Sequence, residues 1–327
     1  MSKPSGAIDM TRGKPINLML RFALPMMIGS IFQSLYSMVD SAVLGRFVGS
    51  HALAAIGATT STTGLILLLA TGVTSAISIV LSQYVGANDT DRVRKGIVAS
   101  GWITLLLGVV LGLISVFAAR PLMQLLKTPE DVIDMSVLYI QIVCGCGIAQ
   151  FAYNAAASIL RALGDSKTPL YFLILCSILN VILDLISVIG LNMGVAGVAV
   201  ATVGSQAISA VICILVMFRK YPNLMPKRHT LRPDMPVSLK IFGMGAQMAL
   251  QSLFLSVGMM VITRVINGYG SNVVAAFTVG SNVQNLAVML FSNFSFGFSV
   301  YVGQNFGAKT RSASSLACGK SSFLSAV

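Results

Sequence analysis

The chain has 327 residues, of which 55% are hydrophobic and only 10% are charged, and its mean hydropathy is +0.84. Soluble domains carry about 25% charged residues, so this composition excludes a soluble globular protein and predicts an integral membrane protein. The net charge of +12 would fit a nucleic-acid-binding protein, but the distribution of the basic residues argues against that class.

Apolar segments that are long enough to cross a bilayer recur along the whole chain. A hydrocarbon core of about 30 Å needs about 20 apolar residues in a helix, whereas membrane strands show alternation over only about ten residues. The runs in this chain are helical in length. We therefore predict an all-α polytopic membrane protein with helices at 16–44, 52–83, 96–118, 132–161, 169–190, 195–218, 237–266 and 272–304, and the start of a ninth near 317.

The basic residues indicate how these helices are oriented. The N-terminal stretch "MSKPSGAIDMTRGKPINLML" contains no cleavage site after a short apolar core, so the first helix is predicted to stay in the protein. When the helices are threaded through a membrane, only four of the 22 Lys and Arg residues fall on one side, namely Arg46, Arg120, Lys127 and Arg264. By the positive-inside rule, the N-terminus and the 219–240 loop are expected in the cytoplasm. The distribution of basic residues thus predicts the membrane topology, and it gives no reason to expect a nucleic-acid partner.

Polar residues form stripes on the predicted spans. In 169–190, Ser177, Asn180, Asp184 and Ser187 share one helical face, and in 16–44 Tyr36 lies beside Asp40. Further stripes are Gln33, Ser37 and Asp40 in the first span, Thr71, Thr74, Ser75, Ser78 and Ser82 in the second, and Thr202, Ser205, Gln206 and Ser209 in 195–218. A single Ser or Thr in such a stripe is typical of bonding to the backbone or between helices.

Asp40 and Asp184 stand out among the ten acidic residues because they lie deep in spans with no Arg or Lys within a helical turn. A charge there costs several kcal/mol unless it is paired, hydrated, metal-bound or protonated. One interpretation is a protonated carboxyl group in a buried hydrogen bond. The other is a coupling site, in which the pair exchanges a proton or, with the Asn180 carbonyl and the Thr202 hydroxyl, supplies oxygen ligands to Na⁺. The sequence leaves H⁺ and Na⁺ open.

A long internal repeat links the two parts of the chain. Two short motifs match when the sequence is shifted by 221 residues. Gln83, Gly86 and Ala87 of the first motif align with Gln304, Gly307 and Ala308 of the second. Because six predicted helices separate the copies, both have the same orientation, which is a known transporter plan with the substrate path between the halves. We predict an N-lobe at 1–218, a cytoplasmic basic linker at 219–236, and an incomplete C-lobe at 237–327 with two helices and the start of another.

The five cysteines lie mostly in apolar helices and have no neighbouring His, so neither a metal or redox centre nor a cofactor is predicted.

Four stretches resemble the multidrug and toxic compound extrusion (MATE) family of secondary transporters. They are "LPMMIGSIFQSLYSMVDSAVLGRFVGSHALAAIG" (24–57), "SQYVGANDTDRVRKG" (82–96), "NAAASILRALGDSKTPL" (154–170) and the helix with Asn180 and Asp184. The resemblance covers essentially all 327 residues, as the first lobe and the opening of the second. It implies a bacterial plasma-membrane protein with two six-helix lobes, C-terminally incomplete here, that exports cationic, amphipathic drugs in exchange for H⁺ or Na⁺.

The resemblance also implies roles for individual residues. The ion-coupling site of the family corresponds to Asp40, Asn180, Asp184 and Thr202, and cavity-lining positions correspond to Gln33, Tyr36 and Asn154. Some members carry acids in the first two helices of the second lobe. Since 237–266 and 272–304 contain none, we expect coupling in the first lobe, as in the DinF-like branch, by alternating access. Pro25 and Gly29 predict either a bend of the first helix when Asp40 changes charge or a static kink.

Three other functions compete with drug efflux. A lipid-linked glycan flippase of related fold would need Arg or Lys inside the cleft, and the central spans are predicted to carry none. An intramembrane aspartyl protease needs two carboxyl groups that share a proton around a water, but "MVDSA" and "LDLIS" lack its glycine-rich setting, so no enzyme is predicted. A truncated membrane protein that does not transport is the third alternative.

Overall fold

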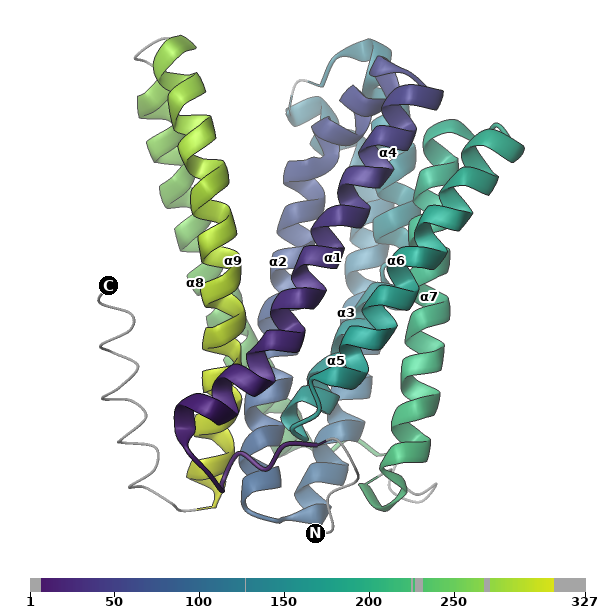
Figure 1. The fold of residues 1–327 in the computed structure, drawn as a ribbon. Helices are drawn as coiled ribbons and strands as arrows, with labels where there is room; N and C mark the ends of the chain where they lie inside the picture. The colour runs from purple at the N-terminus through teal and green to yellow at the C-terminus, as the bar shows by residue number, and fades with distance from the viewer. Residues whose placement is uncertain (1–6, 127, 225, 227–231, 268–270, 309–327) are drawn as a thin grey trace.

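The computed structural model describes residues 7–126, 128–224, 226, 232–267 and 271–308, and these form an all-helical bundle (Figure 1). The helices are α1 (Pro15–Phe47), α2 (Ser50–Gly86), α3 (Thr90–Leu125), α4 (Glu130–Gly145), α5 (Ile148–Ala162), α6 (Lys167–Leu185), α7 (Gly194–Lys220), α8 (Met235–Asn267) and α9 (Ser271–Gly307). A five-residue π-helix, Ile186–Gly190, continues α6, and a 3₁₀ turn, Pro222–Leu224, follows α7. The helix predicted near 317 lies outside the described residues.

One predicted helix is wrong. The segment 132–161 forms two helices, α4 and α5, which are bent by 42° at the break between them. Glycines flank the break at Gly145 and Gly147, and glycine weakens a helix because its backbone loses more freedom on folding. The neighbouring helix α3 also passes close by, since a Cβ on Gly112 would lie 2.9 Å from the carbonyl oxygen of Gly145. Local composition and close packing together explain the bend.

The helices are suited to a membrane. Among the described residues, six are long and apolar enough to span it, and the bent pair α4–α5 makes a seventh. Large apolar side chains such as Leu106, Phe117, Phe254 and Leu255 are exposed on the outside of the bundle. Lipid rather than water can cover such a surface, while helices satisfy their backbone hydrogen bonds internally. The prediction of an all-α membrane protein is confirmed.

Helices α2, α3, α5 and α7 share a core, whose fully buried members include Ile77, Leu81, Leu160 and Cys213, and the start of α8 adds Ile241 to it. Helices α8 and α9 pack on α2, with further contacts to α1 and α3. Figure 1 shows that this pair diverges from the other helices towards the end of the molecule opposite the N-terminus. The two groups are therefore in tight contact at one end and separated at the other.

The repeat is visible in the helix bounds. Helices α2 and α9 both have 37 residues, and α1 and α8 both have 33. Helix α2 runs from 50 to 86 and α9 from 271 to 307, an offset of 221 at both ends, whereas α8 follows α1 at an offset of 220. The offset between the two copies therefore changes by one residue between the first and second helix of each copy. A comparison at a constant offset of 221 residues thus aligns α2 with α9 but not α1 with α8.

The contact between α2 and α9 is reciprocal. A Cβ on Gly86 would overlap the carbonyl oxygen of Gln304, and a Cβ on Gly307, the repeat partner of Gly86, would overlap the carbonyl oxygen of Gln83. Gly303 in turn meets its own repeat partner, Ser82. The two helices thus touch backbone to backbone around a local two-fold axis, which only glycine permits at these positions.

The N-terminal segment lies across the same end of the bundle. The Ile8 amide donates to the Gly164 carbonyl at 2.9 Å, and the Met10 carbonyl accepts from Asn305 Nδ2 at 2.8 Å. Gln304 Nε2 on α9 also reaches the Ala162 carbonyl at 2.9 Å. These hydrogen bonds connect α9 to the turn between α5 and α6, and so hold this end of the molecule closed.

Candidate functional site: a polar cavity next to a buried acid pair

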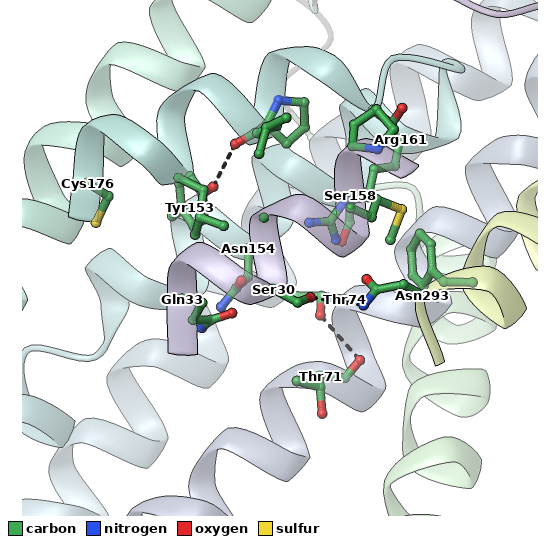
Figure 2. Close-up of a pocket in the computed structure, with 18 of the residues that line it drawn as sticks. Ser30, Gln33, Thr71, Thr74, Tyr153, Asn154, Ser158, Arg161, Cys176 and Asn293 are labelled. Carbon is green, nitrogen blue, oxygen red and sulfur yellow. Dashed lines mark hydrogen bonds between the residues drawn. The ribbon is translucent and has the colours of Figure 1, made fainter. Parts of the chain in front are cut away.

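A cavity of about 430 Å³ lies between α1, α2, α5, α6, α7 and α9 (Figure 2). The three residues predicted to line a cavity, Gln33, Tyr36 and Asn154, all do so. The other polar lining residues include Ser30, Thr71, Thr74, Gln150, Gln206 and Asn293. A pocket of a few hundred Å³ with several amide and hydroxyl groups suits a drug-sized molecule.

Apolar side chains complete the wall of this cavity. Met26 from α1, Met289 and Phe296 from α9, and Leu173 from α6 contribute to it. Methionine adapts its shape to different partners because its side chain is unbranched and polarisable. The mixture of adaptable apolar groups and scattered polar groups favours broad rather than narrow ligand recognition.

The two intramembrane acids face each other beyond one end of the cavity. Asp40 on α1 and Asp184 on α6 are close enough for their carboxyl groups to interact, although neither forms a hydrogen bond of standard geometry with the other. Asp184 is fully buried and Asp40 is half-buried. Oδ1 of Asp40 and both carboxyl oxygens of Asp184 have no hydrogen-bond partner among the described residues. Such groups need a proton, a cation or water.

Asn180 lies one helical turn before Asp184 and is also unsatisfied. It is only 2% exposed, and neither its amide nitrogen nor its amide oxygen has a partner within the described part of the chain. A buried amide with no hydrogen bonds is costly. The polar face of α6 therefore carries an amide and a carboxyl group that no described residue satisfies.

Helix α7 brings Thr202 to the level of these two residues. The antiparallel pairing is fixed by two contacts, from Ser187 Oγ to the Gly197 carbonyl at 3.1 Å and from Cys176 Sγ to Ser205 Oγ at 3.8 Å. Thr202 lies between 197 and 205 on α7, as Asn180 and Asp184 lie between 176 and 187 on α6. Its hydroxyl donates to the Val198 carbonyl at 2.9 Å, which leaves the oxygen lone pairs available.

Two tyrosines accompany the acid pair. The phenol of Tyr36 lies near Asp40 and Cys176, and Tyr139 on α4 lies within electrostatic range of both Asp40 and Asp184. Tyr139 was not found from the sequence, because nothing in its own segment shows that α4 passes beside α1. A tyrosine can both donate and accept a hydrogen bond, so Tyr36, which also lines the cavity, is suited to connect the acids to it.

The helical spacing makes this connection continuous. On α1, Gln33 and Tyr36 line the cavity and Asp40 follows one turn later. On α6, Cys176 lines the cavity and is followed at intervals of four residues by Asn180 and Asp184. Residues spaced by three or four share one helical face, so both faces run from the cavity to the acids.

The opposite end of the cavity contradicts one prediction. The cleft and the central spans were expected to lack Arg and Lys, but Arg161, in the last turn of α5, lines the cavity. Its guanidinium carbon is 5.4 Å from the centre of the Phe296 ring, and its Nε is buried without a partner among the described residues. The break before α5 and the length of that helix, which the sequence did not reveal, place Arg161 inside.

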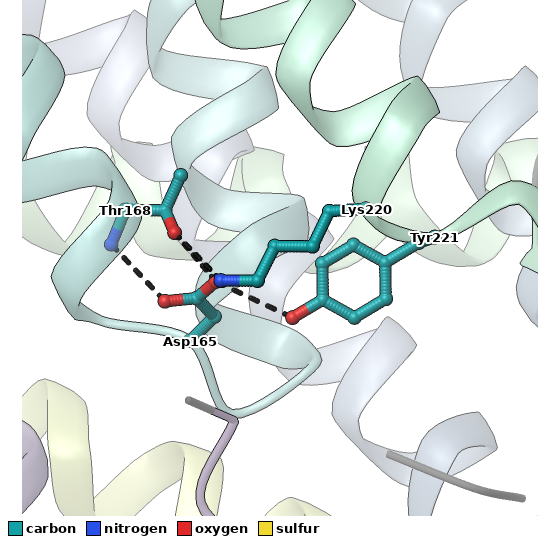
Figure 3. A network of polar contacts seen from close by, with 4 residues as sticks. All are labelled: Asp165, Thr168, Lys220 and Tyr221. Atoms are coloured by element: carbon teal, nitrogen blue, oxygen red, sulfur yellow. Dashed lines mark hydrogen bonds and ion pairs between the residues drawn. The ribbon is translucent and has the colours of Figure 1, made fainter. Parts of the chain in front are cut away.

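The turn between α5 and α6 contains a second buried acid (Figure 3). Asp165 is fully buried and accepts hydrogen bonds from the Thr168 amide at 3.0 Å, from the Thr168 hydroxyl at 2.7 Å and from Lys220 Nζ at 2.6 Å. The Tyr221 hydroxyl donates to it at 3.3 Å, and burial together with the nearby carboxylate raises the pKa of Tyr221. Asp165 thus connects this turn to the end of α7.

A metal centre built only from charged or sulfur ligands is not found, since no group of three or more His, Cys, Asp and Glu side chains comes together within the described residues. The acid pair offers two carboxyl groups, and Asn180 and Thr202 add neutral oxygens. This set of oxygens fits a hard monovalent or small cation better than a soft transition metal.

Comparison with known proteins identifies the fold family. The profile of the MatE family matches residues 25–186 and 248–327. The chain belongs to the MatE family. Family membership places it among membrane transporters rather than enzymes, so the intramembrane protease alternative is excluded.

Two curated MatE relatives illustrate the similarity. The chain is 30% identical over 303 residues to the probable multidrug resistance protein YpnP of Bacillus subtilis, which covers 92% of this chain and 67% of that protein. It is 22% identical over 288 residues to the multidrug export protein MepA of Staphylococcus saprophyticus, with 88% and 64% covered. The chain therefore spans about two thirds of the length of these relatives.

Solved structures of MatE-type transporters share the fold. One is an outward-facing conformation of a multidrug resistance MATE family transporter, with a TM-score of 0.89 and 24% identity; the match covers 97% of this chain and 70% of that one. Another is a transporter from Pyrococcus furiosus described as having a binding pocket of reversed polarity, with a TM-score of 0.87 and 23% identity. The MATE-type fold predicted from the sequence is confirmed.

Proposed function

We propose that this MatE protein takes part in the secondary active efflux of amphipathic, cationic drugs, in exchange for H⁺ or Na⁺. The observation that carries the proposal is the pair Asp40 and Asp184, a half-buried and a fully buried carboxyl group that interact, with Oδ1 of Asp40 and both oxygens of Asp184 unpartnered among the described residues. The names of the relatives YpnP and MepA support drugs as the substrates.

The proposed coupling site consists of Asp40, Asn180, Asp184 and Thr202, and the proposed drug site is the cavity with Gln33, Tyr36 and Asn154. A proton or cation that binds between the two carboxyl groups removes their repulsion and satisfies their oxygens, so it favours the arrangement in which α1 and α6 are close. A cationic drug in the adjoining cavity favours the ionised pair. Because linkage is reciprocal, ion and drug weaken each other's binding, which is the requirement for antiport.

Coupling through α1, α6 and α7 corresponds to the DinF-like branch of the family. The supporting feature is the absence of Asp and Glu from 235–267 and 271–307 in the sequence. We also propose that the closed end of the bundle, with the N-terminus, faces the cytoplasm, since the basic residues concentrate there. The cavity would then open to the outside in the conformation described here.

The test is efflux of a fluorescent cationic drug from cells or vesicles that carry the gene product, under imposed H⁺ or Na⁺ gradients. Asp40→Asn and Asp184→Asn are each expected to reduce gradient-driven efflux at least about tenfold, because an amide cannot exchange a proton or hold a cation by charge. The matched control is Asp134→Asn, which removes an exposed acid that pairs with Arg120 at 3.2 Å.

The gradient that drives efflux identifies the coupling ion. Efflux that persists in both variants at wild-type rates, with equal amounts of folded protein in the membrane, would show that the two carboxyl groups are structural. Loss of efflux in Asp134→Asn as well would point to a nonspecific effect of charge removal.

A lipid-linked glycan flippase is a second candidate, and one observation favours it. Arg161 provides the cation inside the cavity that an anionic substrate requires. Vesicles that contain a fluorescent polyprenyl phosphate separate the two functions, because a flippase changes the fraction of the probe that an added quencher reaches, whereas a drug exporter leaves it unchanged.

A further inference from the structure

Arg161 gives the cavity an electrostatic polarity. Within the described part of the chain, it is the only charged side chain in the cavity wall, which otherwise consists of neutral polar and apolar groups. The nearest acids of the coupling site lie beyond the other end. On α1 the cavity extends from Pro25 to Tyr36, a distance of roughly 16 Å at about 1.5 Å per residue, and Asp40 follows one turn further.

No acid of the described chain neutralises this cation. Its Nε is buried and unpaired, and no ion pair is formed by Arg161 among the described residues. Asp165, the acid closest to Arg161 in sequence, instead forms an ion pair with Lys220 and a hydrogen bond with Thr168. An uncompensated cation in a membrane protein is expensive, so its position in a cavity wall indicates a ligand that compensates it.

The contact with Phe296 does not replace such a ligand. A guanidinium that stacks on an aromatic ring uses its face, whereas its five N–H groups point outward from its edge. The stacking therefore orients the group and leaves its hydrogen-bond donors available. A planar guanidinium is the preferred partner of carboxylate and phosphate because it can bind two oxygens at once.

Other hydrogen-bond donors lie beside Arg161. Ser158 is one turn earlier on α5 and is 2% exposed, and Asn154 lies one further turn along the same face (Figure 2). Across the cavity, Ser30 on α1 receives a hydrogen bond from Asn293 Nδ2 at 2.9 Å, so its own proton is free to be donated to a ligand. Hydroxyl and amide donors around a guanidinium make a site for an anion.

We propose that the Arg161 end of the cavity binds an anionic group of the transported compound, so that the substrates include zwitterions with the anion at Arg161 and the cation towards Tyr36 and Asp40. This inference rests on the proposed efflux function and narrows its substrate class. It assigns Arg161 a role in selecting substrates that is separate from ion coupling.

The test uses two dyes that differ at a single group. Rhodamine 110 carries a carboxylate beside its delocalised cation, and rhodamine 123 is its methyl ester and carries the cation alone. Binding of each dye to the purified, detergent-solubilised chain is measured by fluorescence anisotropy for the wild type, Arg161→Gln, Arg161→Lys and the control Lys167→Gln. Lys167 is an exposed cation at the start of α6 and does not line the cavity.

We expect Arg161→Gln to weaken rhodamine 110 binding at least tenfold and to leave rhodamine 123 binding unchanged or tighter, since a repelling cation is removed. Arg161→Lys should retain part of the preference for rhodamine 110, and Lys167→Gln should retain all of it. Size-exclusion chromatography shows whether each variant is folded.

Four results would overturn the inference. Equal weakening of both dyes would assign Arg161 a packing role. Unchanged rhodamine 110 binding in folded Arg161→Gln would show that the anion lies elsewhere. If the wild-type protein binds rhodamine 123 but not rhodamine 110, zwitterions are not substrates and the efflux proposal stands. If the wild-type protein binds neither dye, both the zwitterion proposal and the efflux proposal are contradicted.

Discussion

Asp165 and Asp184 are both fully buried, yet their surroundings are opposite. Asp165 accepts hydrogen bonds from Thr168, Lys220 and Tyr221, while Asp184 has only another carboxyl group nearby and no hydrogen-bond partner among the described residues. The first acid has a complete set of partners within the protein. The second presents oxygens that are suited to a mobile species.

The hydrogen-bond partners of a buried acid in this fold indicate whether it holds the structure together or can bind another species. A satisfied buried carboxylate contributes to stability because removing it leaves its partners unpaired. An unsatisfied one contributes little to stability and instead retains the freedom to bind. Substitutions at these acids and at their partners test the contrast.

The largest effect is expected for Asp165→Asn. This change leaves the Lys220 ammonium buried against a neutral amide, and it should lower the free energy of unfolding by about 3–5 kcal/mol. Asp184→Asn should change it by less than about 1 kcal/mol, because no hydrogen bond to the protein is lost. The measurement is unfolding of the purified protein in mixed micelles by titration with sodium dodecyl sulfate.

These two variants control for one another, since each replaces a fully buried Asp by Asn. A similar loss of stability in both would show that Asp184 has structural partners after all, and the contrast would fail.

The double variant Asp165→Asn with Lys220→Met sharpens the explanation. Each single change leaves one charged or polar partner without its counterpart, whereas the double change removes both. We therefore expect the double variant to be more stable than the sum of the single effects by about 2 kcal/mol. Strict additivity in the same unfolding measurement would mean that the 2.6 Å ion pair is not a coupled unit.

A smaller effect is expected for Tyr221→Phe. The change removes one hydroxyl that donates to Asp165 at 3.3 Å and keeps the buried ring, so about 1 kcal/mol of stability should be lost. The loss should disappear when Asp165 is already Asn. A full loss in both backgrounds would locate the role of the hydroxyl elsewhere.

The smallest effect is expected at the exposed pair Lys95 and Asp234, which are 2.8 Å apart. Asp234→Asn keeps the hydrogen bond to the Val237 amide that caps α8, and the midpoint of unfolding should stay within the scatter of the measurement because surface ion pairs contribute little. The hydrogen bond from Lys95 lowers the pKa of Asp234 below its usual 3.8. Any stabilisation is therefore present above that pH and is lost as the pH falls through the lower folded value. A large loss at neutral pH would contradict this.

Much of the fold and the two acids could be predicted because the bilayer imposes strong rules on sequence. Long apolar runs indicate helices, and a carboxyl group within such a run, as at Asp40 and Asp184, indicates a special site. The lining role of Gln33, Tyr36 and Asn154 followed from resemblance to a family.

Three features could not be predicted from the sequence: the place of Arg161 in the cavity wall, the place of Tyr139 near the acids, and the break between α4 and α5. Apolar content continues through 132–161, so composition could not show that two glycines and the close passage of α3 bend the segment by 42°. Which side chains then face the cavity depends on that bend. The partners of Asp165 were missed likewise, because Lys220 and Tyr221 are distant from it in the chain, at the far end of α7, and meet it only in the packed bundle.

The glycine contact between α2 and α9 has a mechanical consequence. With about 1.5 Å per residue, the 37 residues of α9 form a lever of roughly 55 Å whose fulcrum, at Gly303 and Gly307, lies near one tip. A tilt of about 10° at the fulcrum would sweep the far tip through roughly 10 Å, the diameter of a helix. Because the glycines at the fulcrum carry no side chains of their own, the two helices can pivot at close range there, and a small rearrangement at one end of the molecule becomes a wide displacement at the other.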